Sequence, residues 1–503
     1  MIGEWIFINK RIPHNMQPPV VNIMEWIYSA ANAAGISTSS FQHSCVLIVV
    51  IYTIHFFVSN YNIINRVIPS YAYNPIRFAN SESVDTVSMK EFINENVPEL
   101  RENAWSLLNP FLFNGHLQTI FAGIRTFRRV DVLYFQRQIL IAEDGGSIAL
   151  DHVVSKERFN DFDAEKMVVP ENQPRDIGDK VRYMTQRELD ELHSEDEKAI
   201  VIALTGLSGS SAESYIRCLF SRLSKNEDFD LYVINSRGCG NVNISTPKLF
   251  CALWTQDIRE TIRYFKERYP HRKIYLFGIS LGSIVMSNYL AQEGENSQVN
   301  LAIALNSIWD LRGSSYFLEN GFISSLCYST ALTFPLLMLI KSHSNELIQN
   351  PVFKSQYTNE MVRKIWKLKD FDDIFTSKMF GFTCADDYYT HASPIYKIPQ
   401  IKTPFINVSA LDDPITGGMQ VGALPLDQAK YNPFITMINT SLGGHVGFFK
   451  WNNVRWYADP LAKLLTDFHE KIVSKPGYNV VVDEKFLPKP AVLVNGELPV
   501  VKL

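Results

Sequence analysis

The sequence lacks the features that mark several large classes of protein. Its 503 residues include 48 basic and 52 acidic ones, a formal net charge of -4, so there is no basic excess that would favour binding to nucleic acid. A C-x-x-C pair is also absent, which argues against a zinc site or a small disulfide framework. We expect free, buried thiols in a reducing compartment. The six cysteines are Cys45, Cys218, Cys239, Cys251, Cys327 and Cys384.

One stretch near the N-terminus lacks charge altogether. Residues 44–64, SCVLIVVIYTIHFFVSNYNII, contain no Asp, Glu, Lys or Arg and a single histidine, His55. A helix of about 20 residues can cross the hydrocarbon core of a bilayer. A signal peptide is disfavoured, because the stretch begins late and no small-x-small cleavage site follows it. We predict a transmembrane anchor here, with an interfacial, re-entrant or buried core helix as alternatives.

The rest of the chain divides by its pattern of apolar residues. After a connector with little periodicity, short runs rich in Val, Ile, Leu, Phe and Tyr alternate with helical patterns. Such alternation predicts a doubly wound α/β sheet. The predicted organisation is an N-terminal segment 1–43, the membrane helix 44–64, the connector 65–125, the α/β domain 126–475 and a C-terminal tail 476–503.

Eight apolar runs within the α/β domain are predicted to be strands. The first two, VDVLYFQRQIL and SIALDHVV, flank the turn composition AEDGG and predict a hairpin. The other six are continuously apolar, which suits a mostly parallel sheet covered by helices on both faces. Two segments interrupt the pattern. Residues 155–197 are polar and predict a solvated insertion or loosely ordered loop, and residues 309–370 predict a helical lid over the carboxyl ends of the strands.

Residues 278–282, GISLG, match the motif G-x-S-x-G. The motif directly follows the apolar run KIYLFG and directly precedes the helical pattern SIVMSNYLAQ. This strand-turn-helix setting is what a nucleophile elbow requires, with small residues around a strained turn that exposes the serine hydroxyl. It predicts that Ser280 is a nucleophile, whereas the alternative is a small residue in a tight turn.

A nucleophilic serine needs a base and an acid that orients the base. Downstream, NVSALDDPITGG places Asp412 and Asp413 after one predicted strand, and NTSLGGHVGF places His445 after the next. The order Ser, Asp, His fits an α/β-hydrolase sheet. We predict Ser280, Asp413 and His445 as the catalytic triad, with Asp413 preferred because Pro414 holds it extended. Asp412 is expected to cap the turn through its own backbone.

An acyl-transfer site also needs donors for the developing oxyanion. One donor is expected from the backbone N–H of the residue after the nucleophile, Leu281. The other is expected from the loop ALTGLSGSSAESY, where the N–H of Leu207 follows Thr205-Gly206. The alternative for this loop is an ordinary strand-to-helix connection. No metal or organic cofactor is needed for such chemistry.

Eight motifs occur in order between about residue 107 and residue 460: NPFLFNGHLQTIF, LTGLSGSSAESYI, NSRGCGN, FGISLGS, FDDIFTSKMFGF, DDYYTHASPI, ALDDPI and GGHVGF. With these motifs the sequence resembles the membrane-anchored abhydrolase-domain family. That family includes vertebrate single-pass abhydrolase lipases, yeast medium-chain fatty-acid ethyl ester synthases/esterases and a bacterial hydrolase branch. The resemblance implies the α/β-hydrolase fold and the nucleophile, acid and base positions given above.

The predicted function is a serine hydrolase that cleaves carboxylic esters of fatty acids, such as monoacylglycerols, phospholipids or short- and medium-chain acyl esters, through an acyl-enzyme. Two alternatives remain open: an acyltransferase or ethyl ester synthase using an alcohol acceptor, and an inactive hydrolase-fold binding protein. None of the eleven histidines has an aspartate five positions later, so an H-x-x-x-x-D acyltransferase motif is absent. We expect a single-pass protein of the endoplasmic reticulum or another intracellular membrane, with a lipid substrate and no nucleic acid or obligate protein partner.

Overall fold

The computed structural model describes residues 62–82, 85–192, 196–321, 323–417, 423–483, 485 and 487. Most of the predicted transmembrane helix lies outside the described residues. At its end, Asn62 and Ile63 are not helical and Ile64 begins a strand. The apolar stretch that could form an anchor helix is therefore shortened to residues 44–61.

An eleven-stranded sheet forms the centre of residues 62–487, in the order β4-β1-β13-β12-β11-β10-β8-β9-β6-β5-β7. The six strands from β13 to β9 are parallel and almost wholly buried, as expected for continuous apolar runs. Their carboxyl ends meet at one edge of the sheet. In chain order these strands are β8 (Ala199–Leu204), β9 (Phe229–Asn235), β10 (Ile274–Ile279), β11 (Leu301–Leu305), β12 (Phe405–Ala410) and β13 (Ile435–Thr440).

All eight predicted strands are present, including the antiparallel hairpin of β5 (Tyr134–Ile141) and β6 (Ser147–Val154). The predicted number of strands is wrong, because three further strands join the sheet. β1 (Ile64–Tyr71) and β4 (Trp105–Leu107) come from the predicted connector, and β7 (Val181–Tyr183) comes from the predicted polar insertion. These strands are short or half-exposed, so they lack a continuous apolar pattern. Arg182, in the middle of β7, forms a buried ion pair with Glu188.

β1 ties the start of the described chain to the end of the parallel sheet. It pairs antiparallel with β13 from Val67 opposite Thr440 to Tyr71 opposite Thr436. The pairing continues past β13, where the N–H of Arg66 donates to Ser441 Oγ at 2.9 Å and the N–H of Ser441 donates to the Arg66 carbonyl at 2.9 Å. The segment predicted as a connector is therefore part of the sheet.

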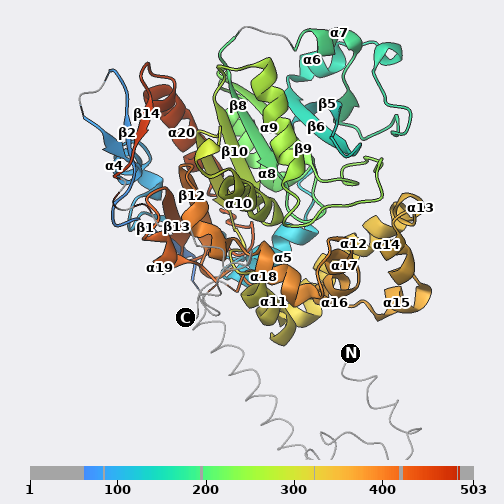
Figure 1. The fold of residues 1–503 in the computed structure, drawn as a ribbon. Coiled ribbons are helices and arrows are strands. Elements are labelled where there is room, and N and C mark those ends of the chain that lie inside the picture. The colour runs from blue at the N-terminus through green and yellow to red at the C-terminus, as the bar shows by residue number, and fades with distance from the viewer. Residues whose placement is uncertain are drawn as a thin grey trace, which may run out of the picture. The chain divides into compact units, whose positions relative to one another are not determined.

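Helices cover both faces of the sheet (Figure 1). On one face α8 (Ser214–Leu223) and α20 (Ala458–Phe468) pack with the sheet into one apolar core. On the other face α9 (Gln256–Arg268) and α10 (Leu281–Glu293) form a second core. The remaining elements outside the insertion include α4 (Met89–Asn96), α5 (Gly115–Ile124), α6 (Lys156–Asn160), α7 (Gln186–Asp190), α19 (Leu426–Ala429) and a small sheet of β2 (Arg77–Ala79), β3 (Val87–Ser88) and β14 (Asn479–Val481).

A helical insertion separates β11 from β12, and Figure 1 shows α11 to α17 gathered together in gold and orange. It begins where the lid was predicted and continues beyond residue 370. The elements are α11 (Leu311–Asn320), η4 (Ser324–Ser329), α12 (Thr330–Ser342), α13 (Ser344–Leu347), α14 (Pro351–Gln356), α15 (Asn359–Lys364), α16 (Leu368–Phe371), η5 (Asp372–Thr376), α17 (Ser377–Met379), α18 (Ala385–Ala392) and η6 (Pro394–Gln400).

η4 and α12 form one apolar run, Ser324–Ser342, which among the described residues is the one helix long and apolar enough to cross a membrane. Its inward side, however, is packed: Leu336, Leu339 and Ile340 belong to the apolar core of the insertion. We therefore interpret this run as a core helix of the insertion.

The five cysteines that the structure describes are all free, as expected. Cys218, Cys239 and Cys251 are buried, whereas Cys384 is half-buried and Cys327 is exposed. The expectation of buried thiols is therefore wrong for Cys327, which lies on the outward side of η4.

Candidate active site

Ser280 lies in the sharp turn between β10 and α10. Its φ is +51°, a left-handed conformation that non-glycine residues rarely adopt. The two motif glycines make the turn possible, because a Cβ at Gly278 would come within 2.6 Å of Ser283 Cα and one at Gly282 would overlap the Leu204 carbonyl. The turn holds the Ser280 side chain at the carboxyl edge of the sheet, where it lines a cavity.

His445 lies in the loop after β13, and its side chain is 9% exposed. Its Nε2 is 2.9 Å from Ser280 Oγ, within hydrogen-bonding distance. The backbone of the histidine is held as well, since its N–H donates to Thr119 Oγ1 at 2.8 Å. The loop thus presents the imidazole to the serine from a fixed position.

Asp413, after β12, is the acid that contacts the histidine: its Oδ2 is 2.8 Å from His445 Nδ1. The same oxygen accepts the side-chain amide of Asn306 at 2.7 Å. Oδ1 accepts the backbone N–H groups of Ile415 and Thr416 at 2.8 and 3.1 Å. Burial would raise the pKa of the Asp413 carboxyl, but the histidine and these backbone donors outweigh it and hold the pKa below its usual range.

Asp412 has a different role from the predicted one. Its Oδ1 accepts the N–H of Gly444 at 2.9 Å, so it supports the histidine loop and does not mainly cap its own turn. Its Oδ2 is buried and has no hydrogen-bond partner among the described residues. Burial, followed by the nearby charge of Asp413, raises the pKa of Asp412 to about 7. A side chain that is partly protonated at neutral pH is poorly suited to hold an imidazolium.

The two predicted oxyanion donors both face the same cavity as Ser280. Leu207 and Leu281 are among the residues that line it. In the part of the chain that the structure describes, neither backbone N–H donates to another residue. The Leu281 N–H is free because it lies at the first position of α10, where no preceding turn supplies an acceptor. Both amides are therefore available to a ligand oxygen.

A buried ion pair fixes the loop that carries Leu207. Arg137 on β5 donates to both oxygens of Asp151 on β6, at 2.6 and 2.8 Å. Asp151 in turn accepts the hydroxyl of Ser211 at 2.5 Å, and the Ser211 N–H donates to Asn235 Oδ1 at 2.9 Å. Because Ser211 lies four residues after Leu207, this network anchors the far end of the loop.

Sequence reasoning missed two supports of the histidine loop. Asn306 lies directly after β11 and has a positive φ. Its side-chain amide donates to Asp413 Oδ2 and also, at 3.1 Å, to the Gly444 carbonyl. The other support is α5, from the predicted connector. Its Thr119 hydroxyl accepts the N–H of His445, and its Gln118 side-chain carbonyl accepts the N–H of Phe449, each at 2.8 Å. A polar residue directly after a buried strand run is the signal that points to Asn306.

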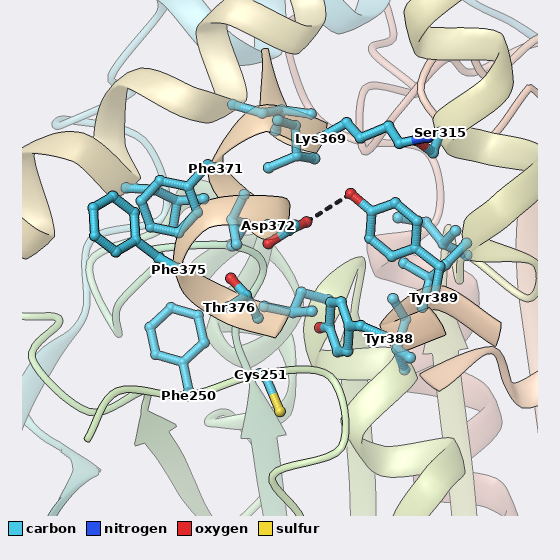
Figure 2. A pocket seen from close by; sticks show the side chains of 18 of the residues that line it. Phe250, Cys251, Ser315, Lys369, Phe371, Asp372, Phe375, Thr376, Tyr388 and Tyr389 are labelled. Atoms are coloured by element: carbon cyan, nitrogen blue, oxygen red, sulfur yellow. Dashed lines mark hydrogen bonds between the residues drawn. The ribbon is translucent and has the colours of Figure 1, made fainter. Parts of the chain in front are cut away.

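The cavity at Ser280 has about 1050 Å³ of empty volume, part of it open to solvent. Side chains from the helical insertion form most of its wall, and most of these are apolar. Figure 2 shows this wall, with the rings of Phe371, Phe375 and Tyr388 around the carboxylate of Asp372. The described residues contain no group of three His, Cys, Asp or Glu side chains that could hold a metal ion.

Taken together, these side chains form a hydrogen-bonded chain from serine to histidine to carboxylate beside two free N–H groups, which is the arrangement required for acyl transfer. A family model described as the alpha/beta hydrolase fold matches residues 199–449. A relative from Saccharomyces cerevisiae is 36% identical over 86% of this chain and 96% of its own length. The chain belongs to the alpha/beta hydrolase family of lipases and esterases.

Within this family the matched relatives carry different names. The 36% identical yeast protein is named monoacylglycerol lipase. A second yeast protein, medium-chain fatty acid ethyl ester synthase/esterase 2, is 33% identical over 78% of this chain and 92% of its own length. Human phospholipase ABHD3 is 26% identical over 75% of this chain and 81% of its own length. The likeness extends well beyond the matched hydrolase domain.

The contact of α5 with the acid and histidine loops gives a first prediction. A Cβ at Gly115 would overlap the backbone carbonyl of Asp412. Gly115→Ala should therefore displace the acid loop, lower ester hydrolysis at least tenfold and destabilise the fold by about 1–3 kcal/mol. Gly123→Ala on the same helix is the control, because nothing lies within 4 Å of its Cβ position. Equal activity of the two variants would contradict the proposed contact.

The second prediction separates the two aspartates. Asp413→Asn should keep the geometry but favour the wrong histidine tautomer, lowering kcat on the order of 10⁴-fold. Asp412→Asn should keep the hydrogen bond from Gly444 and change kcat by less than about tenfold, with its main effect on stability. Steady-state kinetics and thermal melts of both purified variants decide the matter. A large loss of rate confined to the Asp412 variant would reverse the assignment.

Proposed function

We propose that this protein is a hydrolase of fatty-acid carboxylic esters in which Ser280, His445 and Asp413 act as nucleophile, base and acid. The observation that carries the proposal is the hydrogen-bonded chain of these three side chains at an apolar cavity. Ser280 Oγ lies 2.9 Å from His445 Nε2, and His445 Nδ1 lies 2.8 Å from Asp413 Oδ2. Such contacts suit proton transfer in both halves of an acyl-enzyme reaction.

The reaction then proceeds in two parts. Ser280 Oγ attacks the ester carbonyl while His445 Nε2 takes its proton, and Asp413 stabilises the resulting imidazolium. The N–H groups of Leu207 and Leu281 hold the oxyanion. His445 returns the proton to the leaving alcohol, and the acyl group remains on Ser280. His445 then takes a proton from a water molecule that attacks the acyl carbonyl, and it returns the proton to Ser280 Oγ as the bond to the acyl group breaks and the fatty acid leaves.

The form of the cavity supports a lipid ester as substrate. Its wall is mostly apolar, so it gains free energy by removing an acyl chain from water. The names of the relatives support the same class: a monoacylglycerol lipase, an ethyl ester synthase/esterase and a phospholipase. We favour monoacylglycerols, because the relative with that name is 36% identical and spans 86% of the chain.

An alcohol in place of water would give ester synthesis from the same acyl-enzyme. The 33% identical yeast relative is named as both a synthase and an esterase, which keeps this second activity open. Adding ethanol to the hydrolysis assay separates the two, because a synthase diverts acyl groups to the ethyl ester in proportion to the alcohol present. An inactive binding protein is the third alternative, and the serine–histidine contact argues against it.

We also propose that the protein is held on an intracellular membrane by the uncharged residues 44–61. Substrate dissolved in a bilayer is reached best by an enzyme held at that bilayer. The outward side of Ser324–Ser342 supports contact with lipid as well. Its exposed residues from 326 to 338 are Leu326, Cys327, Thr330, Ala331, Phe334, Pro335 and Met338, and none is charged.

The third prediction tests the nucleophile. Ser280→Ala should lower hydrolysis of fatty-acid esters on the order of 10⁶-fold while the protein keeps its melting temperature, because only the attacking oxygen is removed. Labelling by a fluorophosphonate probe should be lost in parallel. Ser287→Ala, two turns along α10, serves as the control for a missing hydroxyl, because its hydroxyl donates to the Ser283 carbonyl and not to Ser280. A folded Ser280→Ala protein with normal hydrolysis would refute the assignment.

The fourth prediction tests the anchor. Deleting residues 1–61 should move the enzyme into the soluble fraction at least in part, because β1 and the rest of the sheet remain intact. Deleting residues 1–43 should leave it on the membrane. Fractionation followed by a carbonate wash measures the outcome. Release of the full-length protein by carbonate would show that residues 44–61 do not span the bilayer.

A further inference from the structure

One carboxylate in the wall of the substrate cavity is used by none of the steps above. Asp372 begins η5, a π-helical turn directly after α16, and lines the cavity together with Ser280. Its side chain is 8% exposed. π-Helical turns are rare and occur frequently at functional sites, because they redirect side chains that a regular helix would place elsewhere.

The hydrogen bonds of Asp372 occupy only some of the acceptor positions of its carboxylate. The hydroxyl of Tyr389 on α18 donates to Oδ2 at 2.7 Å, as Figure 2 shows, and the hydroxyl of Thr376 is a second donor. An ionised carboxylate has about four acceptor positions. Among the described residues, no Lys, Arg or His lies within ion-pair distance of Asp372; Lys369, the nearby cation of the wall, pairs with Asp386 at 3.0 Å.

A buried carboxylate without a cation costs folding free energy. Burial raises the pKa of Asp372 to about 6, so the side chain is mostly ionised at neutral pH. An asparagine could accept the same bond from Tyr389 without that cost. The charge is therefore better explained by a partner that the free protein does not contain.

We propose that Asp372, positioned by Tyr389, is a subsite that binds a hydroxyl group of the substrate. The inference rests on the proposed function and deepens it, because it selects fatty-acid esters that carry a free hydroxyl over esters that carry none. The hydroxyl belongs either to the alcohol part, as in a monoacylglycerol, or to a hydroxylated acyl chain. A hydrogen bond to a charged acceptor contributes about 1.5–3 kcal/mol, equivalent to roughly 10- to 150-fold in kcat/KM.

A cationic head group fits the cavity less well. The rings of Phe371, Phe375 and Tyr388 around Asp372 could attract a quaternary ammonium. In a phospholipid, however, that group comes with a phosphate. Lys369 is the one Lys or Arg among the described residues that line the cavity, and it is already paired with Asp386. A neutral hydroxyl donor needs no such partner.

Two variants of the full-length protein test the subsite. Asp372→Asn removes the charge and keeps an acceptor for Tyr389. The double variant Asp372→Leu/Tyr389→Phe removes the carboxylate together with the tyrosine hydroxyl that donates to it. The control is Asp373→Asn, the same change one residue later, where the carboxylate accepts the N–H of Ala385 and does not line the cavity.

The three test esters are a monoacylglycerol, the ethyl ester of the same fatty acid, and the ethyl ester of a hydroxylated acid of equal length, and phosphatidylcholine is assayed beside them. We expect kcat/KM of the double variant to fall at least tenfold for one hydroxylated substrate and to stay unchanged or rise for the plain ethyl ester. A fall for the monoacylglycerol places the hydroxyl on the alcohol, and a fall for the hydroxylated acid places it on the acyl chain. Asp373→Asn should change none of these ratios.

Thermal stability supplies a second readout. The pKa of Asp372 is raised in the folded state. Burying the carboxylate therefore lowers the free energy of unfolding fully above about pH 6, and this destabilisation disappears as the pH falls towards 4. Asp372→Asn should therefore match or exceed the melting temperature of the wild type at pH 7.5, with an advantage that shrinks by pH 5. A carboxylate kept for structure would instead make this variant less stable at pH 7.5.

Three results would overturn the proposal. Equal losses on all three esters, with the wild type active, would make Asp372 a structural residue. A loss selective for phosphatidylcholine, with hydroxylated esters unaffected, would assign the site to a cationic head group. If the wild type hydrolyses none of the esters, the proposed function is wrong, and the proposed subsite is wrong as well.

Discussion

The contact of Asp413 with His445 is the interaction on which the arrangement of this site depends. Asp413 follows β12 and His445 follows β13, so their contact joins two neighbouring strand ends. Asn306, after β11, donates to the same carboxylate oxygen, and Ser280, after β10, meets the histidine from the other side. Four consecutive parallel strands thus contribute one polar residue each. Their common register turns separations of 32 to 165 residues in sequence into contacts of 2.7 to 2.9 Å.

Much of this could be predicted from the sequence, because buried parallel strands are continuously apolar and the residues after them must lie at one edge. That logic locates Ser280, the aspartate pair and His445. Pro414 favours Asp413 over Asp412, and the structure places Asp413 against the histidine. The sequence also predicts the hairpin of β5 and β6, because turn residues separate two apolar runs there.

The rest depends on contacts that leave no periodic pattern. β4 and β7 are three residues each, too short for a periodic pattern, and the middle residue of β7, Arg182, forms an ion pair with Glu188. Thr119 supports His445 from 326 residues away, so no local signal links them. The predicted role of Asp412 is wrong for the same reason: its partner, Gly444, is 32 residues distant in sequence and contacts it only in the folded sheet.

The pairing of β1 with β13 has a mechanical consequence. Two residues, Asn62 and Ile63, separate position 61 from a strand that runs antiparallel to β13. Beyond the last paired residues, Asn65 Oδ1 accepts the N–H of Leu442, three residues before the histidine. A pulling force on the chain ahead of β1 is thus borne both by the pairing of β1 with β4, which begins at Ile63 and Ile64, and by the bonds to the segment that positions the imidazole. Tension on β1 would therefore act on the position of the His445 imidazole through the hydrogen bonds that join β1 to the segment before this histidine.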